Sequence, residues 1–255
     1  NMNYKEFLPG KNLGHIIDSY WFLDNSSIYG ESQVLPDCSM DIIFNFGNCF
    51  HSKSNSKSIV NNNDIIITGM MTSFKSHSME KDSRLFGVRF KPLGLNRFLN
   101  FGFHNIKNDI IDLNSVIPDS CHQKFRNIFL LAEYKDIIEF FEKIFIEHLN
   151  SRSNDIDLDV SSALQNIYNS ENPSVNELHK IIGISQRYLE IKFKKEIGIN
   201  MKEFINIERF IKTKKEILCS DKSLTEIAVN NGYYDSSHMI KDFIRYTGSS
   251  PKNWK

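Results

Sequence analysis

The side chains that could do chemistry in this sequence fall into two groups: a few thiols and imidazoles in the first half, and an excess of cations in the last third. From Pro173 to Lys255 there are 15 Lys and Arg against 10 Asp and Glu, although the whole chain of 255 residues has 31 of each kind. A local basic face is sufficient to bind phosphate, whatever the net charge of the protein. Solvated basic faces are also common, so the charge excess alone does not predict phosphate binding. The prediction depends on the helices that carry these cations.

Enzyme chemistry finds little support among the thiols and histidines. The conceivable metal ligands are Cys38 with Cys49 and His51, and Cys121 with His122. No CxxC or HxxxH spacing joins them, and buried thiols beside surface histidines are far commoner than metal sites. Motifs for a nucleophile elbow, a phosphate-binding glycine loop or a zinc deaminase are absent. The sequence therefore predicts no enzyme activity, no cofactor and no metal site, and its scattered thiols are typical of a reduced cytoplasmic protein.

The stretch from Ser223 to Trp254 is predicted to place some of the cations on two short helices. It opens with the S-x-x-E spacing of a capping box, which ends at Glu226 and starts the first helix. Gly232 can take the left-handed conformation that ends a helix. Asp235 can then cap a second helix, which ends at Gly248 and turns one apolar face inward. This arrangement is typical of a helix-turn-helix that lays its second helix in the major groove, although any compact helical hairpin would share the pattern.

An internal repeat favours the DNA-binding interpretation. Ser174 and Glu177 repeat the capping spacing 49 residues upstream, and Gly183 stands where Gly232 does. The further correspondences are Ser185 with Asp235, Phe193 with Phe243 and Gly198 with Gly248. Two copies of one unit are therefore predicted, at residues 174–197 and 223–248.

A longer helix is predicted between the two copies, from a cap at Asn200 and Glu203 to about Leu218. Its 18 residues would span roughly 27 Å. The predicted buried stripe consists of Met201, Phe204, Ile205, Ile211 and Leu218. Major grooves on one face of B-DNA recur about every 34 Å, so one chain could place two helices in neighbouring grooves without dimerising.

The segment from about Asp157 to Lys255 resembles the DNA-binding domain of the AraC/XylS family of bacterial transcription regulators. The matching residues are Ile227-Ala228, Gly232-Tyr233, Asp235, Ser237, Met239, Phe243-Ile244-Arg245, Gly248 and Ser250-Pro251. Departures from the family pattern are Tyr233 for Phe, Met239 for an aromatic, Ile244 displacing the basic residue by one, and His179 at the Ala position of the first copy. The resemblance implies a sequence-specific regulator that binds double-stranded promoter DNA.

Family positions also imply roles for individual side chains. Base-reading positions fall at Arg187, Glu190 and Ile191 in the first copy and at Ser236, Ser237 and Lys241 in the second. Arg can pair bidentately with guanine, Glu can accept from cytosine and Ile can touch a thymine methyl. Phosphate contacts are expected from Ser185, Lys194, Lys195, Lys214, Lys215, His238 and Arg245. For any one of these residues, a solvated surface role is equally compatible with the sequence.

Residues 1–150 are predicted to form a β-rich domain with a helical tail. Strand-like runs occur at Ser19–Leu23, Met40–Phe46, Ile65–Thr68 and Leu85–Phe90, and a polar loop is expected at 52–58. A small antiparallel barrel or sandwich fits this pattern. The segments Pro36–Asp41, Gly69–Thr72 and Gly87–Pro92 loosely resemble the cupin-like domain of many AraC-type regulators.

The tail, at about residues 118–150, has apolar residues recurring at threes and fours, which predicts helices. By likeness to the family, these helices pack on the barrel and can form a homodimer interface, whereas simple packing within the domain is equally compatible. The polar stretch Ser151–Asp155 marks the expected boundary with the second domain, at 156–255.

The predicted fold is thus α+β: an antiparallel β-domain with following helices, then an all-α domain of two helix-turn-helix units joined by a long helix. The predicted function is a transcriptional regulator whose first domain senses a small-molecule effector. If the regulator is an activator, it also contacts RNA polymerase. No membrane partner is expected, because no apolar run approaches the roughly 18 residues of a span and the N-terminus lacks the apolar core of a signal peptide.

Two alternatives remain open on the sequence alone. The first domain could be a protein-interaction or dimerisation module without an effector. A remote alternative is a DNA-alkylation-repair methyl acceptor joined to an AraC-like domain. That module needs four clustered cysteine ligands, and Cys38 and Cys49 are the only cysteines in the first hundred residues.

Overall fold

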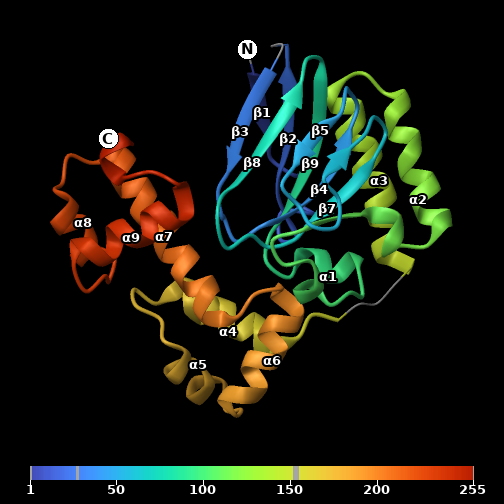
Figure 1. Cartoon of the computed structure of the whole chain (residues 1–255). Coiled ribbons are helices and arrows are strands. Elements are labelled where there is room, and N and C mark those ends of the chain that lie inside the picture. Colours follow the sequence, from blue (N-terminus) through green and yellow to red (C-terminus); the bar gives the residue numbers. More distant parts are fainter. Residues whose placement is uncertain (1, 27–28, 152–154, 255) are drawn as a thin grey trace.

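The computed structural model describes residues 2–26, 29–151 and 155–254 of the chain. Antiparallel sheets form the first half and helices the second (Figure 1), so the predicted α+β fold is confirmed. The expected domain boundary at Ser151–Asp155 falls on residues 152–154, which lie outside the described residues.

Two antiparallel sheets face each other in the first half. The larger sheet contains, in spatial order, β1 (Met2–Phe7), β2 (Ile17–Asn25), β9 (Ser83–Phe90), β4 (Met40–Asn45), β7 (Ile65–Thr68) and β10 (Ile110–Asp112). The smaller contains β3 (Tyr29–Val34), β8 (Lys75–Glu80), β5 (Phe50–Ser52) and β6 (Ile59–Val60). All four predicted strand regions are confirmed, and all belong to the larger sheet. The predicted polar loop begins one residue later than expected, because Ser52 ends β5 and is buried.

The four central strands of the larger sheet, β2, β9, β4 and β7, are apolar on both faces, and these are the strands that the sequence predicts. On one face, the stacked rings of Phe22, Phe44 and Phe86 meet Phe141 of a covering helix. On the other face, Trp21 and Ile43 belong to a smaller apolar cluster between the sheets, which also contains residues of β5 and β8. The strands of the larger sheet therefore separate a packed helical layer from the space between the sheets.

Helices follow the strands as predicted for the tail. They are α1 (Gly94–Phe98), the 3₁₀ turns η1 (Phe103–Ile106), η2 (Leu113–Ser115) and η3 (Asn127–Leu130), α2 (Asp119–Arg126) and α3 (Tyr134–Ser151). In Figure 1, α2 and α3 cover the outer side of the larger sheet and α1 lies at its base. None of the described helices is long and apolar enough to cross a membrane.

The second half contains α4 (Leu158–Asn169), α5 (Val175–Ile182), α6 (Gln186–Ile197), α7 (Met201–Cys219), α8 (Leu224–Asn230), α9 (Ser236–Thr247) and the 3₁₀ turn η4 (Pro251–Asn253). Both predicted copies are present, and α7 joins them. One detail of α7 was wrong: Leu218 is 53% exposed, and Ile217 is buried in its place. The sequence spacing allowed either residue, and contact with α8 and α9 selects the face of α7 that is buried.

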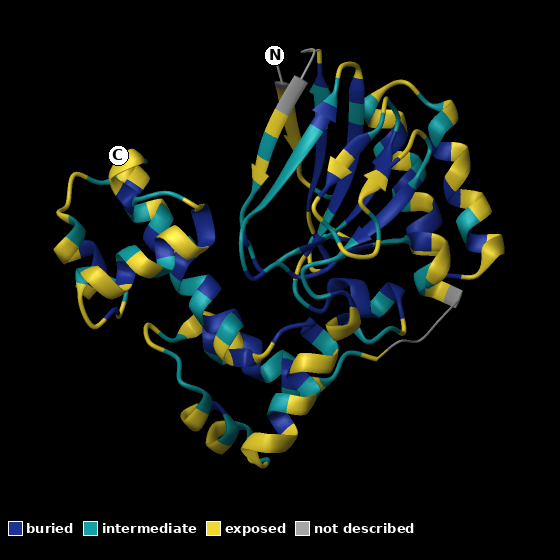
Figure 2. Ribbon diagram, viewed as in Figure 1, coloured by how far each residue is buried: buried dark blue, intermediate teal, exposed yellow. Residues whose placement is uncertain are grey.

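The two halves share one apolar core. A single cluster of buried side chains extends from the larger sheet through α1 and η1 to the helices α4–α9. Polar contacts accompany it: the Asn96 amide on α1 donates to the backbone oxygen of Glu196 on α6 at 3.0 Å, and Lys107 pairs with Glu203 of α7 at 2.6 Å. Figure 2 shows buried residues continuing from the sheets into α7, whereas the outer turns of α5, α6 and α8 are exposed.

Candidate nucleic-acid interface

The first helix-turn-helix unit is α5 followed by α6. Ser174 caps α5 by accepting the N–H of Glu177 at 3.3 Å, and Gly183 ends the helix with a φ of 82°. Ser185 then caps α6 by accepting the N–H of Tyr188 at 3.3 Å. His179, the departure from the family pattern, places Nδ1 3.3 Å from the backbone oxygen of Ile184, so the imidazole makes a polar contact within the turn.

The outer face of α6 carries the residues predicted to read the first sub-site. Arg187 and Ile191 are exposed, as are Lys194 and Lys195 one turn further on. Glu190 is only partly exposed, and its carboxylate accepts a hydrogen bond from the Gln186 amide at 2.9 Å. A cytosine contact by Glu190 would therefore have to compete with Gln186.

The second unit, α8 followed by α9, has the full predicted capping geometry. Ser223 accepts from the N–H of Glu226 at 3.2 Å, and the Glu226 carboxylate returns to the N–H of Ser223 at 2.8 Å. Asp235 caps α9 by accepting the N–H of His238 at 2.7 Å. These bonds satisfy the exposed N–H groups at both helix starts.

On α9, the predicted contact residues lie on the surface. Ser237, His238, Lys241 and Arg245 are exposed, and Ser236 is partly exposed. The opposite face is buried, at Met239, Phe243, Tyr246 and Thr247. The amphipathic pattern therefore turns the apolar side of α9 towards α7 and leaves the polar side open to a partner.

The position of the second unit on α7 is set by one carboxylate. Glu216 of α7 accepts hydrogen bonds from Lys222 at 2.8 Å, Asn230 at 3.0 Å and Asn231 at 2.6 Å. The hydrogen bonds from Lys222 and Asn230 lower the pKa of Glu216. The ionised carboxylate thus ties both ends of α8 to the long helix.

The predicted phosphate contacts differ in their surroundings. Lys195 lies 3.3 Å from the carboxylate of Glu196, and Lys215 is exposed. Lys214 is partly buried near Asp37 and Arg89 of the β-domain, and this burial lowers its pKa. Lys214 therefore lies within electrostatic influence of the first half of the chain, while the other predicted cations are exposed.

Two exposed aromatic residues were missed in the sequence. Tyr234 is 93% exposed in the turn between α8 and α9. Tyr188 is 51% exposed on α6, with the Lys192 ammonium 4.9 Å from its ring centre. No sequence signal separates these rings from buried ones, because Tyr233, directly after Gly232, is itself buried. Such rings offer apolar and hydrogen-bonding contact beside the cations.

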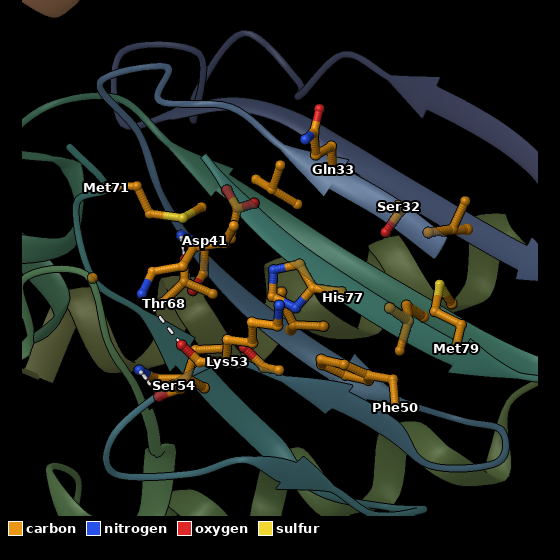
Figure 3. A pocket seen from close by; sticks show the side chains of 18 of the residues that line it. Ser32, Gln33, Asp41, Phe50, Lys53, Ser54, Thr68, Met71, His77 and Met79 are labelled. Atoms are coloured by element: carbon orange, nitrogen blue, oxygen red, sulfur yellow. Dashed lines mark hydrogen bonds between the residues drawn. The ribbon is translucent and has the colours of Figure 1, made fainter. Parts of the chain in front are cut away.

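A cavity of about 280 Å³ lies between the two sheets of the β-domain. Its walls are mainly apolar, and Figure 3 shows side chains of β5 and β8 pointing into it, with His77 near its centre. Burial and the charge of Lys75 lower the pKa of His77 to about 4, and its Nδ1 has no hydrogen-bond partner among the described residues. The imidazole is therefore neutral at pH 7 and available to a polar group inside the cavity.

Two of the residues that line the cavity, Asp41 and Arg89, belong to a partly buried charge cluster. Arg89 lies 3.5 Å from both Asp37 and Asp41, and the Trp21 indole donates to Asp41 at 3.2 Å. Burial raises the pKa of Asp41 to about 7, although Arg89 opposes the shift. Distances of 3.5 Å are long for hydrogen bonds, so this cluster is loosely paired. The charge of Asp37 also acts on Lys214 of α7, so the cluster is electrostatically linked to the DNA-binding half.

One further group of side chains could hold a metal ion. Cys49, His51 and Glu80 bring a thiol, an imidazole and a carboxylate together on the smaller sheet, in the part of the chain that the structure describes.

Comparison with known proteins agrees with this division of the chain. Residues 5–112 match a family described only as a domain of unknown function, DUF6597, and residues 178–255 match the family described as a helix-turn-helix domain. The whole chain also aligns with the crystal structure of ToxT from Vibrio cholerae, with a TM-score of 0.50 and 12% identity, covering 100% of this chain and 97% of ToxT. That similarity concerns the fold.

Curated relatives match part of the chain. An uncharacterized HTH-type transcriptional regulator of Staphylococcus aureus is 28% identical over 85 residues, which cover 33% of this chain and 11% of that protein. The HTH-type regulator YtdP of Bacillus subtilis is 25% identical over 161 residues, covering 58% of this chain and 21% of YtdP. The matched part is thus a small fraction of each relative. The geometry and these matches together identify the C-terminal part of this chain as a helix-turn-helix domain of the AraC type, joined to an N-terminal DUF6597 domain.

Proposed function

We propose that this protein is an effector-responsive regulator that reads promoter DNA with α6 and α9. The observation that carries the proposal is the pair of capped helices, at either end of α7, whose polar faces are exposed. Arg187, Ile191, Ser237 and Lys241 are the exposed base-reading residues in this scheme, with Glu190 and Ser236 beside them. Ser185, Lys194, Lys195, Lys215, His238 and Arg245 bind phosphate, and Lys214 is the least accessible of the proposed phosphate contacts.

DNA selection tests the first part of the proposal. The full chain would be used to enrich sites from random duplex DNA, followed by a salt titration on the enriched sequence. We expect two short sequence blocks about one helical turn apart, and an affinity that falls steeply as salt rises. A matched variant, Arg187→Ala with Lys241→Ala, should lose the enriched motif. Binding without any enriched motif would contradict sequence-specific recognition.

The cavity between the sheets supports effector binding. Its volume is near the lower end of the range of small-molecule sites, and a few polar groups among apolar walls are typical of them. The unpartnered His77 nitrogen and the loosely paired Arg89 favour a compact, mostly apolar ligand with a hydrogen-bonding group. Such a ligand would change the pairing of Arg89 with Asp37, and thereby the surroundings of Lys214 on α7. This is the route by which we propose the effector acts on DNA binding.

Thermal unfolding in the presence of small amphiphilic compounds tests the effector. A ligand of the cavity should raise the unfolding temperature and change the fluorescence of Trp21, which lines the cavity. In the variant Met79→Trp, whose larger side chain would fill the space, both effects should disappear. If no compound in a broad metabolite panel stabilises the protein, the effector hypothesis is contradicted.

A second candidate role for the first domain is dimerisation. It is favoured by Leu130 of η3 and Ile146 of α3, which are 84% and 37% exposed on the helical tail. A homodimer that forms without any ligand and retains full DNA affinity would favour this role. Either way, a promoter-binding protein acts where the bacterial chromosome is, in the cytoplasm, and contacts RNA polymerase if it activates transcription.

A further inference from the structure

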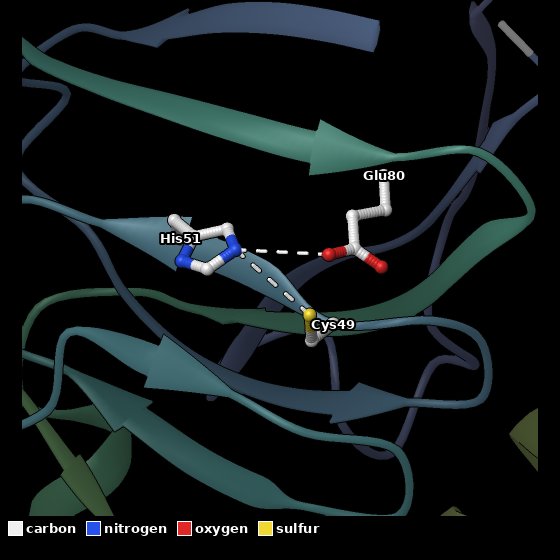
Figure 4. Close-up of side chains that lie close together, drawn as sticks. All are labelled: Cys49, His51 and Glu80. Carbon is white, nitrogen blue, oxygen red and sulfur yellow. Dashed lines mark hydrogen bonds and ion pairs between the residues drawn. The ribbon is translucent and has the colours of Figure 1, made fainter. Parts of the chain in front are cut away.

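The outer surface of the smaller sheet gathers three side chains that can ligate a metal. Cys49 directly precedes β5 and His51 lies in it, and because they are two residues apart along the extended chain they point to the same side. Glu80 ends the neighbouring strand β8, and its N–H donates to the backbone oxygen of Cys49 at 3.4 Å. Strand pairing therefore brings together residues that are 31 positions apart in the sequence (Figure 4).

The ligand atoms are already close to coordination distance. His51 Nε2 lies 3.9 Å from Cys49 Sγ and 3.8 Å from the Glu80 carboxylate, and all three ligand atoms lie within 4.8 Å of one another. With Zn–S of about 2.3 Å and Zn–N of about 2.0–2.1 Å, tetrahedral coordination separates ligand atoms by roughly 3.4–3.6 Å. Small side-chain rotations would therefore close the site without moving the strands.

We propose that Cys49, His51 and Glu80 bind one zinc-class divalent cation at the edge of the smaller sheet. Thiolate, imidazole and carboxylate together suit Zn²⁺ better than Mg²⁺ or Ca²⁺, which prefer oxygen ligands. The side chains of His51 and Glu80 are each 47% exposed, so a cation can enter from solvent and a water molecule can complete the coordination. Cys49 binds as the thiolate, and its proton is released to the solvent.

The site has a structural role in this location. Phe50, Ser52 and Met79 alternate along the same strands with the three ligands, and they point inward to line the cavity. A bound cation joins β5 to β8 directly behind these side chains. It therefore fixes one wall of the cavity at β5, a strand of only three residues.

Cobalt titration tests the site without any assay of DNA binding. The full chain, free of histidine-rich tags, would be stripped with chelator under reducing conditions and titrated with Co²⁺. We expect one equivalent to bind with a thiolate-to-cobalt charge-transfer absorption, which Zn²⁺ then abolishes by displacement. Cys49→Ser should remove this absorption, whereas Cys219→Ser, which changes an exposed thiol elsewhere, should leave it unchanged.

A second variant separates metal binding from folding. His51 is exposed, so His51→Asn should fold normally, as its far-ultraviolet circular dichroism would show. The variant should nevertheless bind Co²⁺ more weakly, by at least the roughly 10–100-fold that loss of even an outer-shell partner costs. Absence of the charge-transfer absorption in the wild-type chain, or its persistence in Cys49→Ser, would overturn the proposal.

Discussion

Arg187 and Lys195 are both exposed on α6, but we expect their replacement to affect DNA binding differently. Arg187→Ala should remove a bidentate contact to guanine, at a cost of about 1–3 kcal/mol on the specific site, and relax the preference at one base pair. Lys195→Ala should weaken binding to all sequences alike, because phosphate contacts carry no sequence information.

Competition binding on the enriched site, on its single-base variants and on random DNA would measure both effects. The salt dependence provides a control, since losing a phosphate contact should lower the salt slope by about 1. Equal losses on specific and random DNA for Arg187→Ala would count against its assignment as a base-reading residue.

His77 gives a prediction about pH. Its pKa is lowered to about 4 in the folded chain, from 6.5, so between these values the unfolded chain binds more protons. The contribution of the neutral imidazole to stability is therefore complete above about pH 6.5 and is lost as the pH falls towards 4, by on the order of 3 kcal/mol. Asp41, whose pKa is raised to about 7, makes the chain less stable as the pH rises towards 7. This effect is the same in the wild-type chain and in a His77 variant, so it cancels when the two are compared.

Urea unfolding of the wild-type chain and His77→Gln at pH 4 to 7 would measure this contribution. The difference between their free energies of unfolding should grow as the pH rises from 4 to 6.5 and then stay constant. His104→Gln, which changes an exposed histidine, should not reproduce the trend. A difference that does not depend on pH would contradict the buried, neutral state of His77.

The sequence predicted single residues well where their position depends on local spacing. Arg187 and Lys241 could be placed on outer helix faces, because the caps and glycines around them fix each helix. Lys214 could not be placed, because its surroundings come from Asp37, far away in the chain. Sequence spacing suggests Cys49 and His51 as metal ligands only in company with Cys38, and without a ligand motif. Glu80 joins them through the pairing of β5 with β8, which no local pattern predicts.

At the scale of elements, Gly183 and Gly198 are a matched pair, because each ends the helix before it with a positive φ. An added Cβ at Gly183 meets nothing within 4 Å, whereas at Gly198 it would lie 3.1 Å from the backbone oxygen of Phe103 in η1. Gly183→Ala should therefore cost only the left-handed conformation, about 1–2 kcal/mol. Gly198→Ala should lower the free energy of unfolding by roughly a further 1 kcal/mol or more, because the added Cβ crowds η1.

Urea unfolding of both variants gives the comparison directly. Equal losses would mean that η1 moves away freely, so that α6 is not held firmly by the first half of the chain. A larger loss for Gly198→Ala would show that this contact resists displacement.

The elements that the sequence missed share a physical cause. β4 and β7 were visible because they are buried on both faces and therefore apolar. β8 has the sequence KSHSME, in which only Met79 is buried, and β5 is three residues long, with Phe50 as its one apolar residue. These strands form because neighbouring strands offer hydrogen bonds and because Phe50 and Met79 cover the cavity. Both causes depend on residues that are distant in the sequence, so the local sequence does not predict the strands.

The whole molecule is expected to unfold cooperatively, because one apolar cluster spans both halves. The two tryptophans allow a direct test, since Trp21 lies in β2 and Trp254 follows η4. In Trp254→Phe, the fluorescence of Trp21 reports on the β-domain, while far-ultraviolet circular dichroism is dominated by the helices. The two signals should change at the same urea concentration.

The reverse variant, Trp21→Phe, provides the control, with Trp254 reporting on the helical half. It loses the hydrogen bond to Asp41, so its midpoint should be lower, but its fluorescence and circular dichroism should still coincide. Separate transitions in either variant would mean that the halves unfold independently despite their shared core.

The long helix α7 has a consequence for the DNA as well as for the protein. It is an uninterrupted helix of 19 residues, and its partners hold it at both ends: Glu203 is paired with Lys107, and Glu216 fixes α8. The two recognition helices are thus carried at a fixed separation and rotation. Where that geometry departs from the pitch of straight B-DNA, the duplex has to bend or twist to meet it. Flexible base steps between the two contact blocks should then be favoured by the energy of DNA deformation, at positions that no side chain touches.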